Sequence, residues 1–125
     1  MKIKKICEDY IEFDNGTIIV DNHNQECCEH VYADWDYLRQ YNTLPQTGEN
    51  ISIFDINFDD DIHNHIEYEK EMGIKLVSKD GNKWFIPCYN SQNGYYGSDL
   101  SLKIQIPNKP KITIDISDYV KDDIC

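Results

Sequence analysis

Reactive side chains are concentrated in one stretch of nine residues, from His23 to Val31. Two histidines and two adjacent cysteines in it, His23, Cys27, Cys28 and His30, match a tetrahedral zinc site in type and number. The spacing fits poorly, because neighbours on a strand point to opposite faces and the two cysteines would need a turn or bulge to converge. Thiol chemistry is a second interpretation. The third, which we favour, puts one cysteine in the core and packs the other on a second face.

A second patch combines carboxylates and imidazoles in the run from Asp59 to His65. Such side chains suit manganese, nickel or zinc, whereas the glycine and the final glutamate of a calcium loop are missing. If a helix begins near Asp61, His63 and His65 lie on different faces of it. The acids are then explained as a solvated helix start, which is the interpretation we favour over a metal site.

Nucleophilic catalysis would need a cysteine beside a histidine and an orienting carboxylate, and Cys28 with His23 or His30 could be drawn in this way. The sequence contains no nucleophile elbow and no element that would supply an oxyanion hole. We therefore expect no enzyme activity and no cofactor. Zinc at residues 23–31, which we call the cysteine box, is the one exception that stays open.

Net charge is the most informative global property of the 125 residues, at −11 with an isoelectric point near 4.6. A surface of this charge repels nucleic acids and anionic membranes, and suits a basic protein surface or plain solubility. Arg39 is the only arginine, and no glycine-rich loop is present, so phosphate recognition is disfavoured.

The acids gather between residues 55 and 71, where they could imitate a row of phosphates and occupy the nucleic-acid channel of a partner. Two adjacent tyrosines between glycines are the best candidates for exposed aromatic contacts, although one of them could pack under its loop. The predicted partner-binding residues are Asp55, Asp59, Asp60, Asp61, Glu67, Glu69, Glu71, Tyr95 and Tyr96.

The length predicts one domain over residues 1–125, and no apolar run is long enough to span a membrane. The N-terminus has lysines but no long apolar region after them, so we expect no signal peptide and a cytoplasmic location. Five cysteines without repeated spacing indicate free thiols in a reducing compartment rather than a disulfide framework.

Three β-hairpins are predicted from alternating apolar residues around turn signals. The first covers residues 3–22 and turns at Asn15-Gly16, and the second covers 74–89 and turns at Asp80-Gly81. The third covers 100–116 and turns through a segment with two prolines. A further strand is expected over 51–58.

Two short helices are expected, over residues 35–41 and over 61–72 with Gly73 as the end of the second. Pro87 should lie at a sheet edge or a bulge, since it lacks an N–H group. The acidic tail, residues 118–125, should be frayed. The predicted fold class is α+β, a single domain rich in antiparallel hairpins with one or two short helices.

Two motifs resemble a family of small phage and prophage proteins classed as a domain of unknown function. Residues 23–31 resemble an H-x-Q-D/E-C-C-E-x-V box, and residues 93–98 resemble an N-G-Y-Y-S turn, although Gly97 intervenes before the serine. The acidic segment 55–72 is also longer than the middle of that family. The resemblance implies a phage or mobile-element origin and a small β-rich domain, and it implies no activity.

We therefore expect a small acidic phage or mobile-element protein that binds and inhibits a host protein with a basic surface. Nucleic-acid-handling or defence machinery is the natural target, which would make the protein anti-CRISPR-like or anti-restriction, and a DNA mimic. A domain that binds a small defence signal or a metal through His23, Cys27 and Cys28 is the alternative. A structural component that forms homo-oligomers through its sheet edges is a third prediction.

Overall fold

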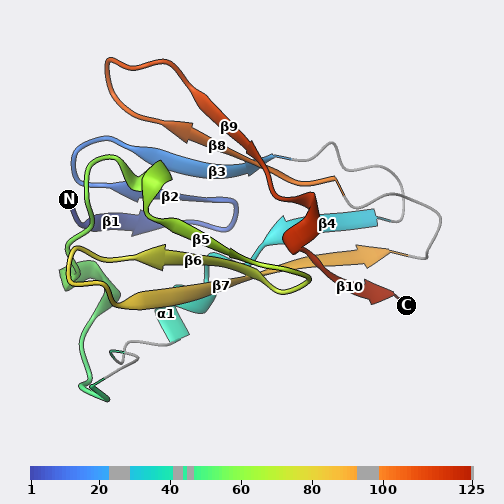
Figure 1. Cartoon of the computed structure of the whole chain (residues 1–125), viewed down its shortest axis with the longest axis horizontal. Helices are drawn as coiled ribbons and strands as arrows, with labels where there is room; N and C mark the ends of the chain where they lie inside the picture. The colour runs from blue at the N-terminus through green and yellow to red at the C-terminus, as the bar shows by residue number, and fades with distance from the viewer. Residues whose placement is uncertain (23–28, 41–43, 45–46, 93–98, 125) are drawn as a thin grey trace.

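A computed structural model describes residues 1–22, 29–40, 44, 47–92 and 99–124 of the chain (Figure 1). Within these residues ten strands form two five-stranded sheets. The single α-helix there, α1 (Tyr37–Gln40), has one turn, so the predicted α+β class is wrong and the fold is β-rich. That helix is also far shorter than the roughly 20 residues of a membrane-spanning helix, and no described helix could cross a membrane.

The first sheet has the strand order β1-β2-β3-β8-β9, and every neighbouring pair in it is antiparallel. At the β2–β3 turn, Gly16 has a φ of 91° and the Asn15 side chain accepts a hydrogen bond from the Thr17 N–H at 2.9 Å. The positive φ of Gly16 and the side-chain hydrogen bond of Asn15 are the reasons that these two residue types favour tight turns, and the β2–β3 pairing confirms the predicted turn of the first hairpin. The strands of this sheet are β1 (Ile3–Ile6), β2 (Tyr10–Phe13), β3 (Ile18–Asn22), β8 (Ser101–Gln105) and β9 (Ile112–Asp115).

The second sheet is built around its longest strand, β7, which pairs with β4, β6 and β10. The β6–β7 hairpin and the β8–β9 hairpin confirm the other two predicted hairpins. β10 runs parallel to β7, so the expectation of a frayed tail is wrong for residues 121–124. The strands of this sheet are β4 (Glu29–Ala33), β5 (Ile66–Glu69), β6 (Gly73–Val77), β7 (Lys83–Gln92) and β10 (Lys121–Ile124).

Pro87 lies inside β7, which is not an edge strand along its whole length, although a described strand pairs with Pro87 itself on one side only. It forms the last pair of the β6 ladder, opposite Gly73, and the next residue, Cys88, pairs with Ala33 of β4. A missing N–H is tolerated at this junction of two ladders. The Pro87 carbonyl still accepts a hydrogen bond from the Asp34 N–H at 2.8 Å.

Two segments between residues 51 and 72 differ from the sequence prediction. The expected strand over 51–58 is instead a 3₁₀ helix, η1 (Ile53–Asp55), in which the Ser52 hydroxyl accepts a hydrogen bond from the Phe54 N–H. The expected helix over 61–72 is a 3₁₀ turn, η2 (Ile62–Asn64), followed by β5. The alternation of Ile66 and Tyr68 with glutamates has a period of two, and pairing with β6 selected the strand over the helix.

Near α1, the predicted helix over 35–41 is confirmed in a shortened form, and Trp35 and Leu38 are both buried. A third 3₁₀ helix, η3 (Ser117–Tyr119), joins β9 to β10. Both sheets and the helical turns contribute to one hydrophobic core. Its aromatic centre stacks edge to face, Phe13 on Phe58 at 5.9 Å and Phe58 on Trp84 at 6.1 Å between ring centroids.

A half-buried carboxylate ties the first sheet to the second. Asp21 of β3 accepts hydrogen bonds from the Ala33 N–H at 3.0 Å and from the Trp35 indole N–H at 3.1 Å. Burial raises the pKa of Asp21, and the two hydrogen bonds partly offset that rise. The contact fixes both ends of the segment that carries the cysteine box.

Candidate functional site

The aspartates at positions 59–61 occupy the connection from η1 to η2, just after the backbone pairs with the start of the chain (Figure 1). The Met1 amino group donates a hydrogen bond to the Phe58 carbonyl and the Phe58 N–H donates to the Met1 carbonyl, both at 2.7 Å. Asp60 then points outward, with 82% of its side chain exposed and 3.8 Å from the Met1 nitrogen. This pairing fixes where the acidic run begins.

His65 lies between two of these carboxylates. Its Nε2 atom is 3.0 Å from an Asp59 oxygen and 3.5 Å from an Asp61 oxygen. We call Asp59, Asp61 and His65 the triad; one possible ligand atom from each lies within 4.8 Å of the other two. The η2 turn is closed by a 2.8 Å hydrogen bond from the His65 N–H to the Ile62 carbonyl, and it places His65 beside Asp61 and beside Asp59, which precedes the turn.

Neighbouring groups hold the triad in place. The Asn64 amide donates to the second oxygen of Asp61 at 3.1 Å, which leaves the first oxygen facing His65. This hydrogen bond is the main reason that the pKa of Asp61 is lowered, and the nearby charges of His65 and His63 lower it further. The Val77 N–H donates to the His65 carbonyl at 2.8 Å and anchors the backbone to β6.

The glutamates of β5 are neutralised by lysines from β6 and from β7, the next strand beyond β6. Glu67 pairs with Lys83 of β7 at 2.8 Å, and Glu69 pairs with Lys75 of β6. A row of acids along the sequence is therefore interrupted on the surface by cations that come from across the sheet. Of the predicted acidic residues, these two display the least net charge.

The two other predicted acids are both exposed. Asp55 ends η1, and Glu71 lies in the β5–β6 turn, where its φ is 61° and its N–H donates to the Asp118 carbonyl. Their side chains form no ion pair within the part of the chain that the structure describes. Asp55 thus extends the exposed negative charge of residues 59–61, whereas Glu71 belongs to a separate turn.

The key side chains of the cysteine box, residues 23–31, and of the tyrosine turn, residues 93–98, are not described by the structure. His23, Cys27, Cys28, Tyr95 and Tyr96 lie outside the described residues. For His30 only the backbone is described, in β4 opposite Ser91. The zinc prediction for the box and the aromatic contact of the tyrosine turn therefore stay predictions.

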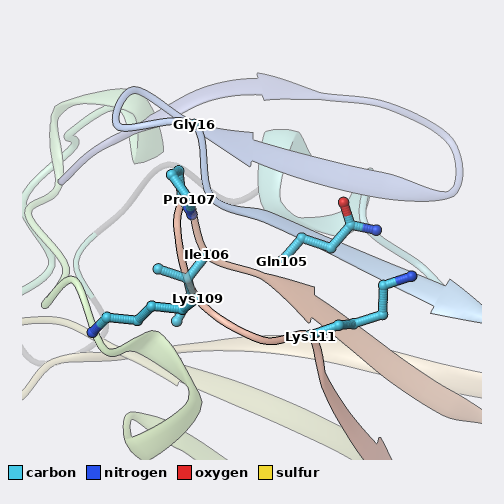
Figure 2. Close-up of a pocket in the computed structure, with 6 residues that line it drawn as sticks. All are labelled: Gly16, Gln105, Ile106, Pro107, Lys109 and Lys111. Carbon is cyan, nitrogen blue, oxygen red and sulfur yellow. The ribbon is translucent and has the colours of Figure 1, made fainter.

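A feature that the sequence reasoning missed is a basic cavity at the β8–β9 turn, with a volume of about 330 Å³ (Figure 2). Residues 100–114 contain three lysines and no acid, and that local composition is the signal that could have revealed it. Lys109 and Lys111 line the cavity but extend in different directions from the turn (Figure 2). They do not converge on one point, so the arrangement is not that of a phosphate clamp.

Comparison with curated proteins and with solved structures finds no match. A family model described as "Domain of unknown function (DUF7448)" matches residues 1–102, which include the cysteine box and the tyrosine turn but neither β9 nor β10. The expectation of a domain family without an assigned activity is confirmed at that level. The chain thus belongs to the DUF7448 family.

Proposed function

We propose that this chain is a non-enzymatic binding domain that docks on the basic surface of a partner protein through its acidic segment, residues 55–61. The observation that carries the proposal is the exposure of three aspartates there, Asp55, Asp60 and Asp61, beside the half-buried Asp59, while the glutamates of β5 are paired with lysines. With a net charge of −11, the whole molecule adds a long-range attraction to any basic surface. The local segment would then set the docking orientation.

The partner class that this charge fits best is a protein whose own ligand is a nucleic acid, because such proteins carry basic channels. Occupying that channel would inhibit the partner without any chemistry by this chain. The resemblance of the cysteine box to phage proteins supports a more specific form of the proposal. In that form the partner is nucleic-acid-handling or defence machinery in the host cytoplasm, and the protein is anti-CRISPR-like.

The experiment is affinity capture of host proteins by the full chain at low and high salt. The test variant is Asp55→Asn/Asp60→Asn, which removes two exposed charges and leaves the triad intact. The control is Glu8→Gln/Asp118→Asn, which makes the same change in net charge at exposed residues of the β1–β2 turn and η3. Both double variants carry the same total charge, so a difference between them reports location.

We expect a basic protein to be captured at low salt, to be released at high salt, and to be lost with the test variant but kept by the control. Salt sensitivity follows because exposed charges are screened within about 10 Å at 0.1 M ionic strength. The proposal is wrong if no basic protein is captured at low salt. Equal capture by the two double variants would also refute it, because segment 55–61 would then not be the interface.

A further inference from the structure

We infer that Asp59, Asp61 and His65 form a binding site for a divalent transition-metal ion of the zinc and manganese class. The donor set is two carboxylates and one imidazole, which these ions accept readily. Calcium is disfavoured, because it takes six to eight oxygen ligands and the triad offers a nitrogen as one of three donors. The inference goes beyond the proposed docking function and does not depend on it.

The distances within the triad agree with a shared ion. Ligands at roughly 2.0–2.2 Å from a metal lie about 3.0–3.6 Å from one another in octahedral or tetrahedral geometry. The His65 Nε2 atom is 3.0 Å from Asp59 and 3.5 Å from Asp61, so both distances from the imidazole fall in this range, and the two carboxylate oxygens lie within 4.8 Å of each other. Without the ion, the Nε2 atom faces the same two carboxylates, and the metal would lie between the imidazole and the carboxylate oxygens.

The surroundings of the triad have the form of an outer shell. Asn64 holds one oxygen of Asp61 and thereby orients the other toward the ion position, as outer-shell donors do in metal sites. The backbone of His65 is fixed on both sides, by Ile62 and by Val77. Rigid placement of this kind reduces the conformational cost of binding the ion.

A second imidazole lies in the same turn as the triad. His63 lies in η2 beside the triad, and its Nδ1 atom is enclosed and has no hydrogen-bond partner among the described residues. Enclosed polar atoms without a partner are uncommon and call for an explanation.

The test is a titration of the full chain, purified without a histidine tag, with Zn²⁺ and with Mn²⁺. Calorimetry gives the Zn²⁺ affinity, and Mn²⁺ serves as a paramagnetic probe, because it favours oxygen ligands over the thiolates of the cysteine box. The variants are His65→Gln and Asp61→Asn. Asp60→Asn is the matched control, since it removes an exposed carboxylate from the same run but not from the triad.

We expect Mn²⁺ to broaden the amide signals of residues 59–65 first, in the wild type and in the control. The Zn²⁺ affinity assigned to this site should fall on the order of ten-fold or more in either triad variant, the size of effect known for disturbed metal sites. If His65→Gln proves unstable in a thermal melt, the Zn²⁺ affinity of Asp61→Asn alone tests the inference. Uniform broadening over all acidic stretches, or an equal loss of affinity in the control, would overturn the inference.

Discussion

Gly73 is the residue whose replacement tests the second sheet most directly. It begins β6 opposite Pro87, and a Cβ atom on it would lie 2.3 Å from the Ile86 carbonyl oxygen and 2.9 Å from the Pro87 Cα. Contacts below 3.0 Å are essentially never seen, so the backbone would have to open by at least 0.7 Å. Since β6 is paired on both sides, by β5 and by β7, that movement cannot be made by one strand alone.

We expect Gly73→Ala to lower the free energy of unfolding by roughly 2–5 kcal/mol, as overpacking costs about 1–3 kcal/mol and an unfavourable backbone conformation a similar amount. Urea unfolding followed by tryptophan fluorescence measures this, because Trp35 and Trp84 are both buried. The control is Gly81→Ala, where φ is 86° and no atom lies within 4 Å of the added Cβ. It carries only the conformational cost, about 1–2 kcal/mol. If Gly73→Ala costs no more than Gly81→Ala, the close approach of β6 to β7 is wrong.

Three further predictions concern single side chains. Because burial raises the pKa of Asp21 above 3.8, the stability of the wild type relative to Asp21→Asn should fall as the pH rises from about 4 toward 7; a rise in denaturant titrations would contradict this. Cys88 is buried and its pKa is raised to about 12, so alkylation at pH 8 followed by peptide mapping should label half-buried Cys7 well before Cys88, and equal rates would refute its burial. Glu67→Gln should cost less than about 1 kcal/mol in urea unfolding, because its pair with Lys83 is half exposed, and the cost should vanish at 1 M salt.

The hairpins were predictable because their turns and their alternation lie in local sequence. Asn15-Gly16 and Asp80-Gly81 mark two of the turns, and both glycines have the positive φ that such turns require. The β8–β9 strands alternate cleanly, and Leu102 and Ile104 are buried as the pattern indicates. Local signals of this kind do not depend on which strands become neighbours.

The errors arose where a partner distant in sequence decides the structure. Residues 121–124 are too polar to predict a strand. They form one because they pair in parallel with residues 89–92 of β7, which are distant in sequence. Ile62 and Ile66 are spaced as on a helix, but both reach the core from a 3₁₀ turn and a strand. The sequence predicts Gly73 as a helix end, whereas the proximity of β7 is what requires a glycine there.

The same distinction applies to the acidic surface, since charge counted along a sequence differs from charge displayed on a fold. Glu67 and Glu69 belong to the acidic stretch, yet β6 and β7 bring a lysine to each of them. Asp59 and Asp61 are also near neighbours in sequence, but the group that faces them is an imidazole, which can give way to a cation. Strand register thus separates the acids into a neutralised face and a triad that can bind an ion, with Asp55 and Asp60 left as exposed negative charge. A partner that docks on segment 55–61 by charge would meet this last group, which is why the test variant of the capture experiment changes those two residues.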